Sequence, residues 1–269
     1  MRLLARCIII LVRVCEKMTR LLFLAQRLLT GILPVLLPPN ELTRLIRNHY
    51  DASYHDVAAH LPETCDKWTL ESWEEDVLAC HEMKAGTILV LGAGVGRESI
   101  ALAQRGFLVV GLDINRESLC VASQQAMAKG LQPLFAQADF LTIPIGPARV
   151  DYLFMSGIMY SFIPGRQQRQ AWLRSLRTCM NEHGLVVLNF MIARDMETRT
   201  YRLIHWLNRW LTTLPGGNQS YQVGDTCFQN HFLHAFVDEE EIRSELDDAG
   251  ATVDQLRWQD GCAVLSWPS

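Results

Sequence analysis

Residues 87–113 read TILVLGAGVGRESIALAQRGFLVVGLD, and this stretch decides the fold. The apolar run Thr87–Leu91 predicts a buried strand, and the glycine-rich segment after it predicts a tight loop. A helix is expected over Gly96–Arg105 and a second buried strand over Leu108–Leu112. Because a strand, a helix and another strand follow one another here, the sheet is expected to be parallel and covered on both faces.

The same alternation continues beyond this unit. Further strands are expected at Leu134–Ala136, Val150–Met155 and Leu185–Phe190, with helices at Arg116–Lys129 and Arg166–Asn181. After an insertion over 191–236, Asp238 is expected to cap a helix that reaches Ala249. Asp260-Gly261 then predicts a hairpin between strands Thr252–Trp258 and Cys262–Trp267. The predicted fold class is therefore α/β, with a doubly wound, mostly parallel sheet that ends in an antiparallel hairpin.

Three parts are expected along the chain: a basic apolar leader (1–39), a helical cap (40–85) and the α/β domain (86–269). The leader has six basic residues and one acid, a net charge of +5. Because the whole chain has a net charge of −4, the other 230 residues carry −9. An acidic body makes nucleic acid an unlikely partner. Eight scattered cysteines without a CxxC pair indicate reduced thiols in a cytoplasmic protein.

Arginines recur every seven residues in the leader, at Arg6, Arg13, Arg20 and Arg27. On a helix they form one stripe beside apolar side chains, which is typical of a helix lying in the membrane interface. The uncharged stretch after Arg27 is too short for a spanning helix, which needs about 20 apolar residues. Three interpretations stay open: a peripheral contact at the inner face of the membrane, a helix packed on its own domain, and a transit or signal segment.

Several polar and glycine positions fall at the ends of the predicted strands. The glycines of LGAGVG (91–96) let the backbone approach a ligand beside a helix N-terminus. Asp113 ends the second strand, where a carboxylate can accept both hydroxyls of a ribose. Asp139 and Phe140 follow the third strand, and a carboxylate beside an aromatic ring suits an adenine.

With these motifs in order, and with VDYLFMSGIMYSFIP (150–164) before GLVVLNFM (184–191), the chain resembles the class I S-adenosylmethionine-dependent methyltransferases over about residues 85–269. The resemblance implies a seven-stranded Rossmann-like sheet and S-adenosyl-L-methionine as cofactor. Many members carry an acidic residue that helps hold the methionyl amine two positions before the first glycine, where this chain has Val90. The implied cofactor site consists of Gly92, Ala93, Gly94, Gly96, Asp113, Ile114, Asp139, Phe140, Ser156 and Gly157.

The catalytic residues are harder to identify from the sequence than the cofactor site. Methyl transfer needs only the alignment of the nucleophile with the methyl group and, for a neutral nucleophile, the removal of a proton. Tyr160 is predicted to face the acceptor, since it follows the fourth strand near the methyl end of the site. His234 is the second candidate, because the segment HAF (234–236) resembles one that often faces the site in the family. Tyr50 and Tyr54 are candidates for covering the cofactor. His231 and His234 supply too few ligands for zinc, so no metal is predicted.

The leading functional prediction is a methyltransferase that acts on a small-molecule or lipid-like acceptor. A tRNA or RNA methyltransferase and a non-catalytic, cofactor-binding interaction module are the alternatives. A nicotinamide dehydrogenase is disfavoured because its loop would read GxGxxG. A helix over Met196–Leu211 carries Trp206 and Trp210 on one face. This face is predicted to pack in the core, with a substrate lid or a membrane-facing surface as alternatives.

Overall fold

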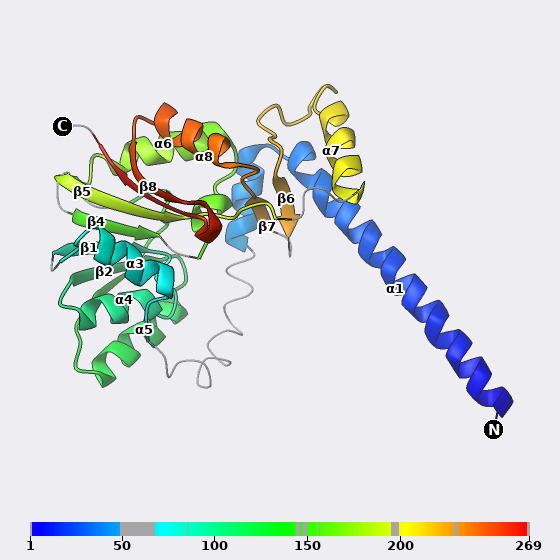
Figure 1. The fold of residues 1–269 in the computed structure, drawn as a ribbon, viewed down its shortest axis with the longest axis horizontal. Coiled ribbons are helices and arrows are strands. Elements are labelled where there is room, and N and C mark those ends of the chain that lie inside the picture. The colour runs from blue at the N-terminus through cyan, green and yellow to red at the C-terminus, as the bar shows by residue number, and fades with distance from the viewer. Residues whose placement is uncertain are drawn as a thin grey trace.

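The computed structural model describes residues 2–48, 68–84, 86–143, 146, 150–155, 157–194, 199–228 and 231–267. Figure 1 shows an α/β body from which one long N-terminal helix projects. The main sheet has seven strands in the order β3-β2-β1-β4-β5-β9-β8. Their bounds are β1 Thr87–Leu91, β2 Leu108–Asp113, β3 Leu134–Gln137, β4 Val150–Met155, β5 Met180–Asn189, β8 Thr252–Arg257 and β9 Cys262–Ser266.

Strands β1 to β5 pair in parallel, and β9 pairs antiparallel with both β5 and β8. The predicted doubly wound sheet with a terminal hairpin is confirmed. Because β1, β2 and β4 are parallel neighbours, the loops that follow them meet at one edge of the sheet. That edge carries the glycine loop and the residues predicted after β2, β3 and β4.

Helices cover both faces of the sheet, as Figure 1 shows. Alternate residues of β1 point to opposite faces: Leu89 and Leu91 lie in the core on the side of α6 and α8, and Ile88 and Val90 lie on the side of α3 and α4. All four side chains are buried, which explains why the strand is a continuous apolar run. The helix bounds are α3 Ser72–Cys80, α4 Arg97–Gln104, α5 Arg116–Ala128, α6 Arg166–Leu176 and α8 Glu239–Asp248.

Two predicted element boundaries were wrong. The helix expected over Arg166–Asn181 ends at Leu176, and β5 begins at Met180 instead of Leu185. Met180 pairs with Val150 across a bulge in β4, so the polar residues after Met180 belong to a strand end and not to a helix. The turn before β9 is also longer than predicted, because Trp258–Asp260 form a short 3-10 helix.

The insertion forms a separate small layer. It contains α7 Arg199–Leu211 and a two-stranded antiparallel sheet of β6 Asp225–Phe228 and β7 His231–His234. Buried residues of this layer, including Phe232, pack against Leu42 and Ile46 of a helix over 39–48 and against Phe162. Phe162 ends the 3-10 helix η2 Met159–Phe162, which follows β4. The insertion therefore holds helix 39–48 next to the loop that follows the fourth strand.

The leader is one helix, α1 Arg2–Leu36, and it ends before Pro38 as predicted. Over residues 8–27 every side chain is exposed, and Leu22 and Phe23 are 68% and 62% exposed. The base of α1 is attached to the body, since the Asn208 side-chain amide donates to the Gly31 carbonyl at 2.7 Å. Packing on its own domain is therefore wrong for residues 8–27 and correct for the base.

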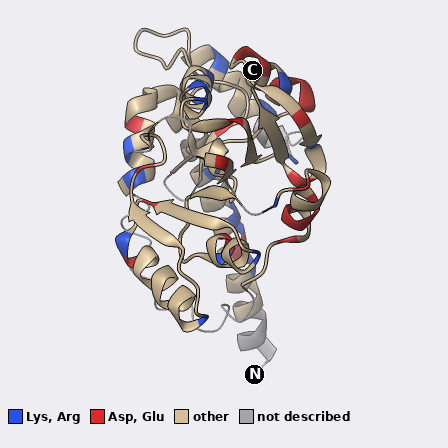
Figure 2. Ribbon diagram, turned by 90° about the vertical axis from the view of Figure 1, so that its left-hand side faces the viewer, with Lys and Arg blue, Asp and Glu red and all other residues tan. Residues whose placement is uncertain are grey.

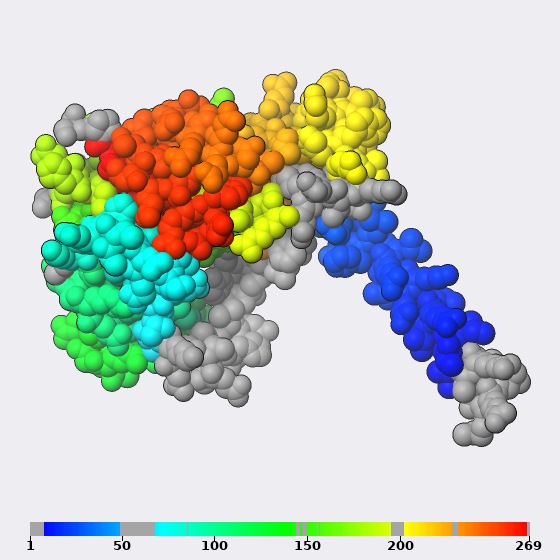
Figure 3. All heavy atoms as spheres, viewed as in Figure 1, coloured from blue at the N-terminus to red at the C-terminus, as the bar shows by residue number. Residues whose placement is uncertain are grey.

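The exposure of the tryptophans of α7 differs from the prediction. Trp206 and Trp210 are 67% and 55% exposed, so the expected core packing of this face is wrong. The buried side of α7 is the one that faces α1, where Ile204 lies against Gly31 so closely that a Cβ on that glycine would be 2.8 Å from Ile204 Cγ2. Figure 3 shows α1 projecting from the body and α7 at the corner beside the base of α1. Among the described residues, no helix has both the length and the apolarity needed to cross a membrane.

Candidate active site

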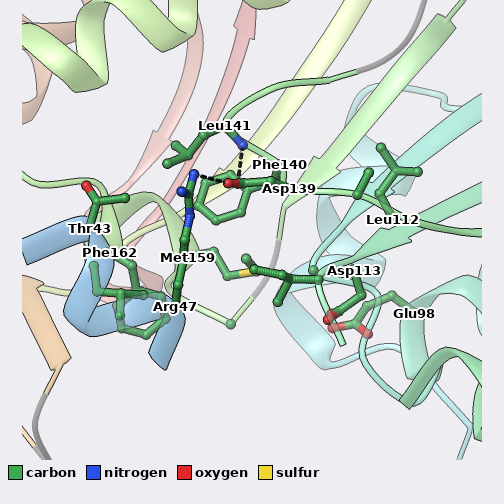
Figure 4. A pocket seen from close by; sticks show the side chains of 15 residues that line it. Thr43, Arg47, Glu98, Leu112, Asp113, Asp139, Phe140, Leu141, Met159 and Phe162 are labelled. Carbon is green, nitrogen blue, oxygen red and sulfur yellow. Dashed lines mark hydrogen bonds and ion pairs between the residues drawn. The ribbon is translucent and has the colours of Figure 1, made fainter. Parts of the chain in front are cut away.

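A pocket lies at the edge of the sheet where the loops after β1, β2, β3 and β4 meet (Figure 4). Six residues of the predicted cofactor site line it: Gly92, Asp113, Ile114, Asp139, Phe140 and Gly157. Nine further lining residues were not predicted: Thr43, Ile46, Arg47, Glu98, Leu112, Ala138, Leu141, Met159 and Phe162. The first three belong to helix 39–48, so one wall of the pocket comes from the N-terminal part of the chain.

The glycine loop turns sharply between β1 and α4. Gly92, Gly94 and Gly96 have φ angles of 67°, 50° and 92°, which lie in the left-handed region that favours glycine. Gly96 has a further constraint, since a Cβ there would be 2.8 Å from the Ala122 Cβ of α5. Ala93 is buried, and its N–H donates to the Leu112 carbonyl of β2. Gly92 thus lines the pocket while Ala93 and Gly96 hold the loop against the fold behind it.

Asp113 connects the first two strand ends. Its carboxylate accepts the Gly94 N–H and the Asn115 N–H, both at 2.8 Å. Burial raises the pKa of Asp113 even though the backbone N–H donors favour its ionised form. A carboxylate has about four lone-pair positions, so these two bonds leave acceptor capacity that faces the pocket.

Asp139 lies farther along the pocket, as Figure 4 shows. One carboxylate oxygen accepts the Leu141 N–H at 2.9 Å, and the other pairs with the Arg47 guanidinium. Phe140 lies beside it and makes an edge-on contact with Trp172, with ring centroids 6.0 Å apart. The carboxylate and the ring predicted for an adenine therefore line the same pocket, and Arg47 of helix 39–48 reaches the carboxylate.

Tyr160 does not line the pocket, in contrast to its predicted catalytic role. It is fully buried and stacks on Phe236, and its hydroxyl donates to Glu245 at 2.6 Å. Burial, followed by the negative charge of Glu245, holds the pKa of Tyr160 well above its usual value. In the short helix η2 it is Met159 and Phe162 that line the pocket, so Tyr160 points into the core instead.

His234 is also absent from the pocket lining. Its ring is fully buried, with Nδ1 2.7 Å from Asp225 and Nε2 3.4 Å from Glu241. Burial and Arg169 lower the pKa of His234, but Asp225 and Glu241 outweigh them and the net shift is upward. The predicted catalytic role of His234 is not supported by this position, because its polar atoms are directed at other protein groups.

Tyr160 and His234 belong to a buried polar cluster that also contains Arg169, Asp225 and Glu245. Arg169 is fully buried and donates to both oxygens of Glu245 at 2.7 Å. The cluster joins α6, α8, η2 and the insertion, so it fastens these elements together. The pairs within it are charge-assisted, which is how charged groups are tolerated away from water.

Three predicted residues lie outside the described residues: Ser156, Tyr50 and Tyr54. Of the unpredicted lining residues, Glu98 had a usable signal, since it lies in the first turn of the helix that follows the glycine loop. Arg47 and Thr43 had none, because they reach the pocket only through the packing of helix 39–48 on the insertion.

Comparison with known proteins agrees with the geometry. A family model described as a methyltransferase domain matches residues 88–184. The match identifies residues 88–184 as a methyltransferase domain, and the seven-stranded sheet around them agrees with the Rossmann-like methyltransferase fold. No curated protein matches the sequence. Solved structures share the fold of this chain at low sequence identity.

Three such structures illustrate the likeness. An S-adenosylmethionine-dependent methyltransferase from Methanosarcina mazei is 18% identical with a TM-score of 0.55, covering 74% of this chain and 98% of that one. One from Clostridium acetobutylicum is 12% identical with a TM-score of 0.56, covering 82% and 99%. The 1,6-didemethyltoxoflavin-N1-methyltransferase of Burkholderia thailandensis, bound to its acceptor and S-adenosylhomocysteine, is 16% identical with a TM-score of 0.58, covering 86% and 88%.

The pocket of the methyltransferase fits its cofactor, S-adenosyl-L-methionine, by the chemistry of its lining. An adenosine offers hydroxyl and amine donors, and the methionyl part carries a positive sulfur and an ammonium group. The pocket presents the carboxylates of Glu98, Asp113 and Asp139, and apolar surface from Leu112, Ile114, Phe140 and Leu141. At Gly157 a Cβ would meet nothing within 4 Å, so the backbone there leaves space. Acceptors for the donors and apolar surface for the base are therefore both present.

Proposed function

We propose that this methyltransferase transfers a methyl group to a small-molecule or lipid-like acceptor at a membrane surface. The main support for the proposal is that one wall of the pocket is formed by the N-terminal part of the chain. Thr43, Ile46 and Arg47 line the pocket from helix 39–48, and this helix follows α1 after a break at Pro38. The pocket is thus next to the base of a helix whose apolar side chains are exposed.

The chain's own residues would bind and orient the reactants. S-adenosyl-L-methionine supplies an electrophilic methyl group on a positively charged sulfur. Asp113 and Asp139 would hold the nucleoside, and the glycine loop would let the backbone approach the methionyl part. Ile46, Met159 and Phe162 add an apolar wall that excludes water and suits an acceptor with an apolar body. Alignment inside such a pocket is the main contribution that this chemistry needs.

Charge and apolar exposure both support a membrane as the surface. The described part of α1 carries Arg13, Lys17, Arg20 and Arg27 among exposed apolar residues. Over the body, basic and acidic residues are mixed, as Figure 2 shows. A helix with apolar side chains and several cations is suited to the interface of an anionic bilayer, where each cation contributes about 1 kcal/mol.

The exposed face of α7 adds a second contact of the same kind. Leu203, Trp206 and Trp210 have helical spacing and share one face, and each is more than half exposed. Ile204 and Asn208 face α1, which fixes α7 beside its base. Tryptophan is enriched at membrane interfaces because one end of its ring is apolar and the other is polar.

The acceptor class is tested by labelling. The full-length protein is incubated with S-adenosylmethionine labelled in the methyl group and with a total lipid extract in vesicles, and the organic phase is counted. The proposal expects label in the organic phase that depends on the protein and is abolished by S-adenosylhomocysteine. Label that enters only water-soluble extract components, with none in lipid, would show that the acceptor is a soluble small molecule.

The membrane surface is tested by sedimentation with vesicles of phosphatidylglycerol and phosphatidylcholine. Replacing Arg13, Arg20 and Arg27 by Gln should weaken binding by roughly 3 kcal/mol, or about a hundredfold. The matched control replaces Lys84, Arg116 and Arg243 on the body by Gln and should leave binding unchanged. Equal loss in both triple variants would contradict a contact made through α1.

A second pair of variants tests whether the exposed face of α7, and not apolar exposure in general, contributes to vesicle binding. Trp206→Ser with Trp210→Ser should reduce binding to the same vesicles. Met127→Ser with Leu134→Ser is the control, because these side chains are 71% and 68% exposed on the body. Binding that survives the tryptophan changes would remove α7 from the proposed surface.

A further inference from the structure

One wall of the pocket carries a positive charge. Among the described residues that line the pocket, Arg47 is the basic one. It extends from helix 39–48, and its Nη2 pairs with Oδ2 of Asp139, as the dashed line in Figure 4 shows. The other oxygen of Asp139 accepts the Leu141 N–H at 2.9 Å. One oxygen of this carboxylate is thus held by its own turn, and the other by the N-terminal part of the chain.

The ion pair between Arg47 and Asp139 is easily opened. The side chain of Arg47 is 48% exposed. An exposed ion pair contributes only about 0–1 kcal/mol, because water screens the charges and competes for them. Arg47 can therefore leave Asp139 without becoming a buried charge, in contrast to Arg169, which is fully buried with its partner.

The adenine contact proposed for Asp139 uses the same carboxylate. An adenine amine that donates to Asp139 competes with Arg47 for Oδ2, because Oδ1 is held by the Leu141 N–H. Helix 39–48 is fixed by its packing against the insertion, so Arg47 stays at the pocket wall when the adenine takes its partner. A guanidinium that has lost a carboxylate partner attracts another anion.

The wall around Arg47 is apolar. Ile46 precedes it on the same helix, and Met159 and Phe162 pack in the same apolar cluster as Ile46. All three side chains line the pocket. Leu33, near the base of α1, packs against this cluster as well. The apolar wall is therefore continuous from the pocket to the base of the helix whose basic and apolar side chains are exposed.

The charge differs between the two ends of the pocket. Asp113 lies beside the glycine loop, at the end opposite Arg47 in Figure 4. A carboxylate repels an anionic ligand, whereas a guanidinium attracts one. An anionic group is therefore favoured at the Arg47 end, where the apolar part of the same molecule can contact Ile46 and Phe162.

We propose that Arg47 binds an anionic group of the methyl acceptor, a phosphate or a carboxylate, after the adenine of the cofactor has taken Asp139. The acceptor is thus an amphipathic anion whose apolar part contacts Ile46, Met159 and Phe162. The inference rests on the proposed function and deepens it, because it gives the charge of the acceptor and the residue that recognises it. The exchange of partners also links the two ligands, since each one favours binding of the other.

The test uses three probes with a decyl chain, each below its micelle concentration: decyl phosphate, decanoate and the neutral decyl glucoside. They are titrated by calorimetry into the full-length protein saturated with S-adenosylhomocysteine. Arg47→Gln is expected to weaken the anions about tenfold or more, the range for a hydrogen bond to a charged group. Its affinity for decyl glucoside should stay within about twofold. Binding of S-adenosylhomocysteine shows that the variant is folded.

Arg44→Gln is the matched control. Arg44 lies on the same helix, pairs with Glu41 and is not among the lining residues, so this variant should bind all three probes as the wild type does. Arg47→Lys keeps the positive charge and should recover part of the affinity for the anions that Arg47→Gln loses.

The exchange of partners is tested by omitting S-adenosylhomocysteine. In the wild type, the anions should bind about two- to fivefold more tightly with S-adenosylhomocysteine than without it, because the pair of Arg47 with Asp139 no longer has to be opened. Arg47→Gln should abolish this difference. Equal affinities with and without S-adenosylhomocysteine in the wild type would overturn the proposal.

Inorganic phosphate separates a lipid headgroup from a free phosphate. Decyl phosphate is expected to bind more tightly, because its chain contacts the apolar wall. The same affinity for inorganic phosphate would overturn an amphipathic acceptor.

Two further results would overturn the proposal. Equal weakening of the anions and of decyl glucoside in Arg47→Gln would mean that Arg47 supports the wall and not the charge. Unchanged binding of the anions in Arg47→Gln would remove Arg47 from the acceptor site. Neither result affects the cofactor assignment, which fails only if the wild type does not bind S-adenosylhomocysteine. Methyl label confined to neutral lipids would keep the proposed function and overturn this inference alone.

Discussion

The cofactor pocket and the buried polar cluster both gather charged side chains, but they do so in different ways. In the pocket, Asp113 and Asp139 accept from N–H groups two residues ahead of them, at Asn115 and Leu141. In the cluster, Arg169 and Glu245 join two helices that are far apart in sequence, and both side chains are completely buried. Asp113 and Asp139 are thus each held in part by their own turn and line the pocket, whereas Arg169 and Glu245 are paired with each other away from it.

We expect this difference to separate residues that bind a ligand from residues that hold the fold. A side chain bonded by its own turn keeps lone pairs for a ligand. A fully buried ion pair must satisfy its charges within the protein, because the cost of desolvation is otherwise not recovered. Tyr160 and His234 have the residue types of catalytic groups, but they lie in the second kind of environment.

The largest expected effect comes from breaking the buried polar cluster. Glu245→Ala leaves the Arg169 guanidinium buried without its partner and should reduce the free energy of unfolding by about 3–5 kcal/mol. Asp248→Ala on the same helix is the control, because its pair with Arg166 is more exposed and should contribute at most about 1 kcal/mol. Urea denaturation measures both. A similar, small loss in the two variants would contradict the distinction between pocket and cluster.

The pH dependence of stability should reveal the contribution of protonated His234 to the cluster. Its folded-state pKa is raised above 6.5, because Asp225 and Glu241 outweigh burial and Arg169. The protonated form therefore adds stability that is fully present below about pH 6.5 and is lost as the pH rises through the folded pKa. The melting temperature should fall over this range in the wild type, and the fall should be smaller in His234→Gln. His183→Gln, at an exposed position, is the control; an unchanged slope in His234→Gln would exclude this role.

A smaller effect is expected at the edge of the pocket. An adenine amine bound at Asp139 would compete with Arg47 for the carboxylate. We therefore expect Arg47→Ala to tighten S-adenosylmethionine by about two- to fivefold, within the range of an exposed ion pair. Arg44→Ala is the control, since Arg44 lies on the same helix and pairs with Glu41. Calorimetry that finds weaker binding in Arg47→Ala would show that Arg47 helps to hold the cofactor.

The sequence predicted the parts of the molecule that depend on local chemistry. β1 and β4 were predicted with their exact bounds, because both are short apolar runs between polar or glycine residues. Asp113 and Asp139 were assigned to one site because they follow strands in the order of the motifs that the chain shares with the methyltransferase family. Burial of Tyr160 and His234 could not be predicted, since it depends on Glu245 and Asp225, which reach them only in the folded chain.

In the N-terminal part, too, the sequence predicted local features but not contacts that form only in the folded chain. A helix in the leader, with its end near Pro38, follows from periodicity and from proline chemistry. The approach of Arg47 to Asp139 depends on packing of helix 39–48 against the insertion, and no spacing in the sequence encodes it. The exposed tryptophans of α7 were assigned to the core because an apolar helical face has the same pattern whether it is covered by protein or not.

The central claim is that Asp113 binds the cofactor while Tyr160, in the buried polar cluster, does not. Calorimetry with S-adenosylmethionine on the wild type, Asp113→Ala and Tyr160→Phe tests it in one experiment. The account predicts that Asp113→Ala weakens binding by about 1–3 kcal/mol, the cost of unpairing a buried hydrogen-bonded group, and that Tyr160→Phe leaves the affinity unchanged. Weaker binding in Tyr160→Phe together with unchanged binding in Asp113→Ala would contradict the account.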